Sequence, residues 1–273
     1  MNDVGVVYLS KSKKALGEWQ KMLEKSFIPL VRLNADGSVI GFGGSGAILE
    51  FRNQRFLCSV RHVFLQELIG MQIKWDLEHF GTATAPIRPD FFMEEPDQNA
   101  KVNFKLENAK YLDFAVYNLF QISDIPMLQQ LNPNATGEIE SERRRTVFRE
   151  KCLTKPKLGI EYGFAGITMP SRAPHPTSKI NIAGGIVRPY DRLTYHGDEN
   201  GLHLFKLPGE HPGHKFFYGC SGAPIIDAKG YIVAFVSGTT EQGLIRGFPA
   251  SVAKSILAGC VLADKSEAQS KKL

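Results

Sequence analysis

The sequence predicts an all-β fold of two antiparallel six-stranded β-barrels, with one helix near each end of the chain. Short runs rich in β-branched and aromatic residues are separated by turns of Asn, Asp and Gly, which is typical of consecutive antiparallel strands. These runs form two sets, one on each side of a less regular middle at residues 121–155. Two such sets around a connector predict two small barrels.

The first element is a short amphipathic helix within residues 13–26. Leu16, Trp19, Met22 and Leu23 recur at helical spacing, with charged residues between them. We expect this N-terminal helical extension, residues 1–26, to pack its apolar stripe against a barrel or against a partner.

The strands of the first barrel are expected within residues 27–155 and those of the second within residues 156–263. The first set reads FIPLVRL, SVIGFGGSGAILEF and RFLCSVRHVF, and the second reads LGIEYGFAGI, SKINIAGGIV, GLHLFKL, APIID, YIVAFVSG and LIRGFPA. The middle contains prolines and the charged run EIESERRR, which predicts a connector with a helical insertion. A last helix is predicted at SVAKSILAGCVLA, followed by a flexible tail at residues 264–273.

The composition is that of a globular chain without nucleic-acid or membrane partners. The 273 residues are 43% hydrophobic and 22% charged, with a net charge of +5, which is ordinary for one large domain or two small ones. The basic residues are scattered without an aromatic-interleaved stripe, so we interpret the surplus as a solvated surface. No apolar run has the length of a membrane span, and the apolar run at the start is too short for a secretory signal.

The four cysteines, Cys58, Cys152, Cys220 and Cys260, lie far apart, without the spacing of a zinc site or a disulfide framework. We therefore expect a reducing, cytoplasmic setting and no metal. The glycine-rich run GFGGSG at residues 41–46 lies between strands and not before a helix, so we interpret it as a bulged hairpin and not as a nucleotide site.

Ser221 is the first candidate for chemistry. It stands in YGCSGAP, where small residues let the backbone turn sharply and present one side chain to a cleft. A serine hydroxyl needs an imidazole to take its proton and a carboxylate to orient that imidazole. His62 closes the apolar strand in FLCSVRHVF, and Asp113 in YLDFAVYNL is a carboxylate among apolar residues that needs a partner when buried.

Together these motifs resemble those of the chymotrypsin/trypsin-like serine peptidases. SVRHV is similar to the histidine motif of that superfamily, LDFAV to its aspartate motif and GCSGAP to its G-x-S-G-[GA]-P motif, in the same order and over most of the chain. The resemblance implies a cleft between two barrels, with Ser221 as nucleophile, His62 as general base and then general acid, and Asp113 as the acceptor that holds the imidazole. It implies no cofactor, because the triad supplies its own base.

The resemblance also implies the groups that surround the triad. The main-chain amides of Gly219 and Ser221 would form the oxyanion hole, where one donor contributes about 3 kcal/mol to transition-state stabilisation. Ser237 and Gly238, in FVSG, resemble the strand that pairs with the substrate main chain, and the Ser237 hydroxyl would donate to Asp113.

Lys215, six residues before the nucleophile, stands where the primary pocket of such enzymes has its base or wall. A lysine in the pocket would favour an acidic or amide-bearing substrate side chain. The other interpretation, a loop that turns Lys215 to solvent, is the one we favour. His214 and Arg246 are further pocket candidates.

Cys220 replaces the aspartate that precedes the nucleophile in the animal digestive enzymes, where it captures a newly cut N-terminus. No Ile-Val-Gly-Gly start is visible either. We therefore predict a bacterial or HtrA-like type that needs no zymogen cleavage. Cys220 itself is expected to be a small buried residue, because viral cysteine relatives place their nucleophile at the position of Ser221.

The predicted function is that of a serine endopeptidase with a polypeptide substrate, and control by a regulatory protein partner is a hypothesis. The alternative is a catalytically silent trypsin-like domain that binds a peptide or scaffolds a partner. An esterase with the same triad is less favoured, because an α/β-hydrolase places its serine between a strand and a helix, whereas Ser221 precedes a strand.

Overall fold

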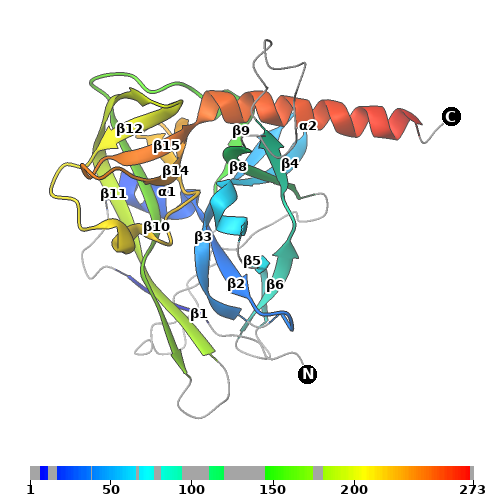
Figure 1. The fold of residues 1–273 in the computed structure, drawn as a ribbon, viewed down its shortest axis with the longest axis horizontal. Coiled ribbons are helices and arrows are strands. Elements are labelled where there is room, and N and C mark those ends of the chain that lie inside the picture. Colours follow the sequence, from blue (N-terminus) through cyan, green and yellow to red (C-terminus); the bar gives the residue numbers. More distant parts are fainter. Residues whose placement is uncertain are drawn as a thin grey trace, which may run out of the picture.

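The computed structural model describes residues 7–11, 17–37, 39–65, 68–76, 81–93, 111–119, 145–174 and 181–270. Two β units lie side by side, and the long helix α2 (Ala250–Ser270) runs across both of them (Figure 1). The predicted all-β fold with a helix near each end is confirmed.

The N-terminal unit is a curled sheet with the strand order β6-β5-β2-β3-β4-β8-β7, to which β9 adds in parallel on β3. The strands are β2 (Ile28–Leu33), β3 (Val39–Phe51), β4 (Gln54–Ser59), β5 (Leu68–Asp76), β6 (Gly81–Ile87), β7 (Asp90–Met93), β8 (Tyr111–Asn118) and β9 (Val147–Arg149). In the described residues the edge strands β6 and β7 do not pair with each other, so this half is a curled half-barrel and not the closed barrel expected. The edge strand β7 is short and mostly exposed, so it offers few main-chain groups for pairing with β6.

The C-terminal unit is a closed six-stranded barrel. Its strands follow the order β11-β10-β13-β14-β15-β12, and a pairing between β11 and β12 closes the ring. They are β10 (Glu161–Pro174), β11 (Asn181–Glu199), β12 (Leu202–Lys206), β13 (Pro224–Asp227), β14 (Ile232–Thr239) and β15 (Ile245–Pro249). The hairpin of β10 and β11 extends beyond the barrel (Figure 1).

The N-terminal extension contains a strand as well as the predicted helix. Strand β1 (Val7–Lys11) pairs in parallel with β11, an element that the sequence analysis did not predict. At the start of helix α1 (Glu18–Ser26), the side-chain oxygen of Gln20 accepts a hydrogen bond from the main-chain N–H of Gly17 and so caps the helix. It packs on β10 and β11, where Gln20 donates to Asp191 at 2.8 Å and Leu23 is fully buried.

The end of the connector is fastened to this helix. Arg145 is 7% exposed, donates to the main-chain oxygen of Glu24 at 2.7 Å and lies 5.0 Å from the centre of the Phe27 ring. Burial lowers the pKa of Arg145 to about 9, and the nearby Glu24 opposes that shift. The predicted helical insertion of the connector lies mainly outside the described residues; the described part supplies β9 and the 3₁₀ helix η4 (Glu150–Cys152).

Helix α2 extends further than predicted. Ala253, Leu257 and Val261 are buried at helical spacing, and the helix packs on β14 and β15. It continues to Ser270, so residues 264–270, predicted as part of a flexible tail, are helical. Among the described residues no helix is both long and apolar enough to cross a membrane.

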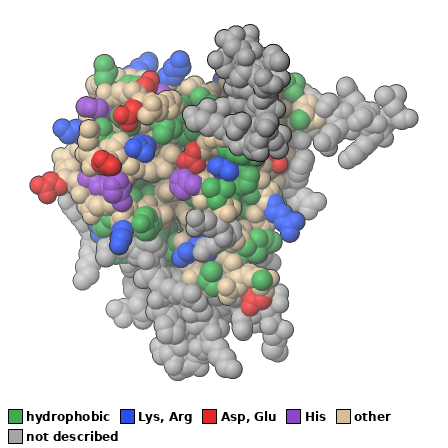
Figure 2. All heavy atoms as spheres, in the orientation of Figure 1, with side chains coloured by type: hydrophobic (Ala, Val, Ile, Leu, Met, Phe, Trp, Pro, Cys, Tyr) green, Lys and Arg blue, Asp and Glu red, His purple; other side chains and the backbone are tan. Residues whose placement is uncertain are grey.

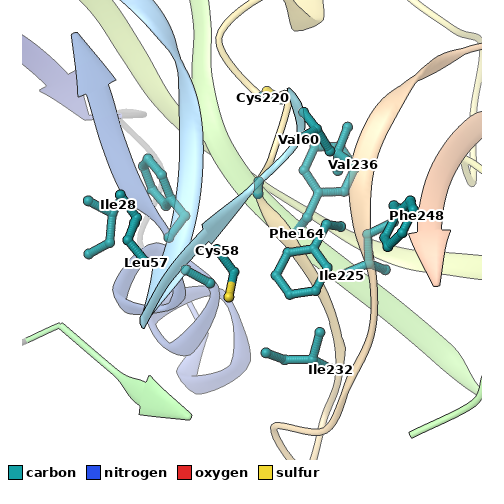
Figure 3. Packing of buried hydrophobic residues seen from close by; sticks show 14 of the residues in the cluster. Ile28, Leu57, Cys58, Val60, Phe164, Cys220, Ile225, Ile232, Val236 and Phe248 are labelled. Atoms are coloured by element: carbon teal, nitrogen blue, oxygen red, sulfur yellow. The ribbon is translucent and has the colours of Figure 1, made fainter. Parts of the chain in front are cut away.

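One hydrophobic core runs through both units. Ile28 and Leu57 of the N-terminal sheet belong to the same buried cluster as Phe164 and Ile225 of the barrel (Figure 3). Phe114 of β8 stacks on Phe248 of β15, with ring centres 4.9 Å apart, and also contacts Phe235 of β14. The residue next to Asp113 is therefore anchored in the opposite unit.

The buried Arg145 generates a stability prediction. Exchange of Arg145 for Ala removes the donor to Glu24 and the contact with Phe27, so we expect the free energy of unfolding to fall by about 3 kcal/mol. Urea denaturation measures this loss. Arg149→Ala, at an exposed position of β9, is the matched control and should change stability by less than about 0.5 kcal/mol. Equal effects of the two exchanges would contradict the anchoring role of Arg145.

Candidate active site

His62 and Asp113 form a hydrogen-bonded pair at the face of the N-terminal sheet. Strand β4 ends at Ser59, and the 3₁₀ helix η1 (Arg61–Phe64) then buries Val63 and leaves the His62 side chain 41% exposed. Nδ1 of His62 lies 3.0 Å from both carboxylate oxygens of Asp113, and its main-chain N–H donates to Oδ1 at 3.1 Å. With Nδ1 donating to a carboxylate, Nε2 is the ring nitrogen left to accept a proton.

Asp113 also receives a hydrogen bond from the barrel. The Ser237 hydroxyl on β14 donates to Oδ2 of Asp113 at 2.5 Å, which is the contact implied by the resemblance. Burial acts to raise the pKa of this carboxyl, but the hydrogen bonds from His62 and Ser237 outweigh it and hold the pKa below its ordinary value. Asp113 therefore stays ionised and can stabilise an imidazolium at His62.

Ser221 lies in a tight turn between the 3₁₀ helix η5 (His214–Phe217) and β13. Gly222, the next residue, has φ of +88°, and a Cβ at that position would lie 2.0 Å from the main-chain oxygen of Ser45 and 2.1 Å from the Ser59 hydroxyl. Only glycine fits there. The N–H of Gly222 donates to the main-chain oxygen of Val236, so a hydrogen bond to β14 stabilises the turn.

Ser45 of β3 fastens the same turn from the N-terminal sheet. Its main-chain N–H donates to the oxygen of Ser221 at 2.7 Å, and its hydroxyl donates to the oxygen of Gly219 at 2.7 Å. The Ser59 hydroxyl in turn donates to the oxygen of Ser45 at 2.6 Å. Ser45 and Ser59 are buried, so the hydrogen bonds that their hydroxyls make are well shielded from water.

Ser221 and His62 line one cavity of about 420 Å³, together with Ser237 and Gly238 of β14. Within the described part of the chain no hydrogen bond joins the Ser221 hydroxyl to the His62 ring. Such contacts are often long in the absence of substrate and tighten in the reacting complex. The structure thus places Ser221 and His62 at one cavity, and Asp113, which is not among the lining residues, orients the His62 ring.

The predicted oxyanion hole lies in the same turn. Besides the amide of Gly222, two further amides of this turn are occupied, because Cys220 donates to the oxygen of Phe217 and Ala223 donates to the oxygen of Cys220. Gly219 forms an isolated antiparallel bridge with Ile167 of β10, at a position where a Cβ would lie 2.3 Å from the Ile167 oxygen. The use of the Gly219 and Ser221 amides as oxyanion donors remains a prediction.

Cys220 is fully buried beside the nucleophile. Burial raises the pKa of its thiol far above the ordinary value, and the sulfur lies 3.7 Å from the main-chain oxygen of Ile167. Gly166 makes room for it, since a Cβ there would lie 2.7 Å from the sulfur. A buried, protonated thiol of this kind is a packing residue and not a nucleophile.

The predicted specificity residues fall in different places. Lys215 is exposed and is not among the residues that line the cavity, whereas its neighbour His214 lines it. Thr239 of β14, which the sequence analysis did not select, lines the cavity too, and its hydroxyl contacts Nδ1 of His214. Arg246 lies on β15, outside the lining.

Two functional residues were thus missed, and each had a signal. Ser45 is the polar residue in the glycine-rich run, where close packing of the backbone could have been inferred. Thr239 lies two residues after Ser237 on β14, close enough in sequence to the predicted substrate-pairing residues to have been considered with them.

No protein-family model and no curated protein matches the chain. Among solved structures, it is similar to the serine endoprotease from Yersinia pestis, at 9% identity and a TM-score of 0.45 over 90% of this chain and 67% of that chain. It is also similar to human heparin binding protein, at 12% identity and a TM-score of 0.47 over 90% of this chain and 94% of that chain. The candidate site rests on its own geometry.

The Ser45 contacts generate a prediction on the nucleophile turn. Ser45→Ala leaves the buried Gly219 oxygen without its donor, so we expect a loss of about 1–2 kcal/mol in stability and slower reaction of Ser221 with a fluorophosphonate probe. Thermal unfolding and the rate of labelling measure the two effects. Ser255→Ala, on the exposed face of α2, is the control. An unchanged rate of labelling in Ser45→Ala would show that the reactivity of Ser221 does not depend on the hydrogen bond from Ser45.

The hydrogen bond from Ser237 generates a prediction on Asp113. Loss of a donor to the ionised carboxylate disfavours that form, so Ser237→Ala should raise the pKa of Asp113. The wild-type contact contributes stability at neutral pH that is lost as the pH falls through the lowered pKa, and the variant should show less of this loss. Carboxyl NMR titration measures the shift. Asp198, whose pKa is lowered by other partners, provides the reference and should titrate unchanged in both proteins.

Proposed function

We propose that the protein is a serine endopeptidase that cleaves polypeptides through an acyl-enzyme on Ser221. One observation carries this proposal: His62 and Ser221, which come from the two units, line one cavity with Ser237, and the Asp113 carboxylate is bonded to Nδ1 of His62 and to the Ser237 hydroxyl. This is the arrangement that activates a serine hydroxyl.

In the first step the Ser221 hydroxyl attacks the carbonyl carbon of the scissile bond while Nε2 of His62 takes its proton. The imidazolium is stabilised by Asp113, and the negative oxygen of the tetrahedral intermediate would be bound by the amides of Gly219 and Ser221. His62 then gives the proton to the leaving amine as the carbon–nitrogen bond breaks. An ester on Ser221 remains.

In the second step water replaces the amine. His62 takes a proton from the water as its oxygen attacks the ester, and returns that proton to the Ser221 oxygen when the carbon–oxygen bond breaks. The peptide leaves with a free carboxylate, and the enzyme is restored. Asp113 stays ionised throughout, in keeping with its lowered pKa.

The N-terminal segment supports activity without zymogen cleavage. Strand β1 and helix α1 are parts of the fold, since β1 pairs with β11 and α1 is fastened by Arg145. The residue before the nucleophile is the buried Cys220, which has no carboxylate to capture a new N-terminus. The intact chain is thus the proposed active form.

A catalytically silent peptide-binding domain is the second candidate function. The observation that favours it is that, among the described residues, the Ser221 hydroxyl makes no hydrogen bond with the His62 ring. In this case the cleft would bind peptides without cutting them, either alone or with a regulatory partner.

Labelling with a fluorophosphonate probe tests the proposal. The purified intact chain should label, and Ser221→Ala and His62→Ala should not, because the hydroxyl reacts only when the imidazole takes its proton. Asp113→Asn should lower the turnover of a cleaved peptide about 10⁴-fold while the protein remains folded. His196→Gln, at an exposed position outside the cavity, is the histidine control and should label like the wild type.

Two other outcomes would redirect the assignment. Labelling only after lysate of the source cells is added would support control by a partner. No labelling of the folded chain under either condition would overturn the peptidase and favour the silent domain.

A further inference from the structure

The lining of the cavity contains basic side chains and, among the described residues, no Asp or Glu. Its basic members are Arg32, His62 and His214, and of these His62 is already paired with the Asp113 carboxylate. Figure 2 shows the face of the molecule on which histidine side chains gather over the C-terminal barrel. Such a lining attracts an anionic group and repels a lysine or arginine side chain.

His214 is held in place by Thr239. Helix η5 begins at His214, after Gly213 with φ of +102°, and the hydroxyl of Thr239 on β14 contacts Nδ1 of the ring. Because Nδ1 is occupied by this partner, Nε2 is the ring nitrogen that remains for a ligand. When the Thr239 hydroxyl donates to Nδ1, Nε2 carries the ring proton and can donate it to an oxygen acceptor.

The surface around His214 is aromatic. His211 packs against His214, with ring centres 5.7 Å apart, and against Phe217 at 5.1 Å. Burial and the neighbouring His214 lower the pKa of His211, so this second ring stays neutral. Phe217 is buried below the cavity, and Tyr218 is 61% exposed at its edge. The subsite therefore combines apolar walls with one polar anchor, which suits a short aliphatic stem that ends in a charged group.

The position of the anchor indicates which part of a substrate would meet it. His214 and Thr239 lie on the barrel, near Ser221, whereas His62, which gives its proton to the leaving amine, lies on the opposite unit. Ser237 and Gly238, which would pair with the substrate main chain, directly precede Thr239. The side chain that reaches His214 therefore belongs to the half of the substrate that becomes the acyl group.

We propose that the cleft selects an acidic side chain on the residue immediately before the scissile bond, with His214 as the residue that binds its carboxylate and Thr239 as the residue that positions His214. This proposal rests on the proposed peptidase function and names its substrate class. Lys215, although next to His214 in sequence, has no part in this recognition.

Peptides that differ only in the residue before the bond test the proposal, with Glu, Asp, Gln, Lys or Phe at that place. The wild type should cleave the Glu or the Asp peptide with kcat/KM at least about tenfold above the Gln peptide, and the Lys peptide most slowly. His214→Gln should lower kcat/KM for the preferred acidic peptide about 10- to 100-fold, and more than it does for the Phe peptide, because it removes a hydrogen bond to a charged group. Thr239→Val should act in the same direction with a smaller effect.

Two variants separate this assignment from its competitors. His196→Gln makes the same exchange at an exposed position outside the lining and should keep the acidic preference. Lys215→Gln should also keep it. A preference that survives His214→Gln, or that is lost in Lys215→Gln and not in His214→Gln, would overturn the proposal, as would a wild type that prefers the Lys peptide.

Failure of the peptidase function is recognised separately by fluorophosphonate labelling. Where the wild type labels but cleaves all peptides equally, only the specificity proposal fails. Where it does not label, the affinities of the same peptides for Ser221→Ala, measured by calorimetry, still test whether His214 binds an acidic side chain. Tighter binding of an acidic peptide than of the Lys peptide, lost when His214→Gln is added, supports the anchor, and equal binding of all peptides overturns it.

Discussion

The cleft depends on the contacts that Ser45 makes across the two β units. One residue of the N-terminal sheet binds the main-chain oxygens of Ser221 and Gly219 and so fixes the nucleophile turn relative to the unit that carries His62. A nucleophile and its base on separate units need such a fixed reference, because a misplacement of about 1 Å costs about 10²-fold in rate. Ser45 and Ser59 supply it with buried hydrogen bonds.

Glycine makes these contacts possible. A Cβ at Gly44 would lie 3.0 Å from the Ser221 oxygen, and one at Gly46 would lie 2.9 Å from the Cys58 oxygen. The glycines of this run thus allow the backbone of β3 to contact the backbone of β4 and of the turn that contains Ser221. On the other side, Phe114 and the Ser237 hydroxyl tie the Asp113 strand to the barrel. Contacts between the two units therefore lie both at the turn that carries Ser221 and at the strand that carries Asp113.

The β architecture, the pairing of His62 with Asp113 and the position of Ser221 at the same cavity could be predicted from the sequence, because short motifs and strand patterns are local. The role of Ser45 could not, since its partners at residues 219 and 221 are distant in the chain and a glycine-rich run has several uses. Strand β1 was missed for the same reason, because its partner is β11. The choice between His214 and Lys215 depends on the rotation of a 3₁₀ turn, where neighbouring side chains point in different directions. Spacing from the nucleophile does not reveal that rotation.

The pairing of β1 with β11 has a consequence for biosynthesis. Strand β1 leaves the ribosome well before its partner residues, from Ala183 to Val187, are translated. The same delay separates Ser45 from the turn it binds. A nascent chain therefore holds no assembled cleft until Ser221 and strand β14, which line it, have been made.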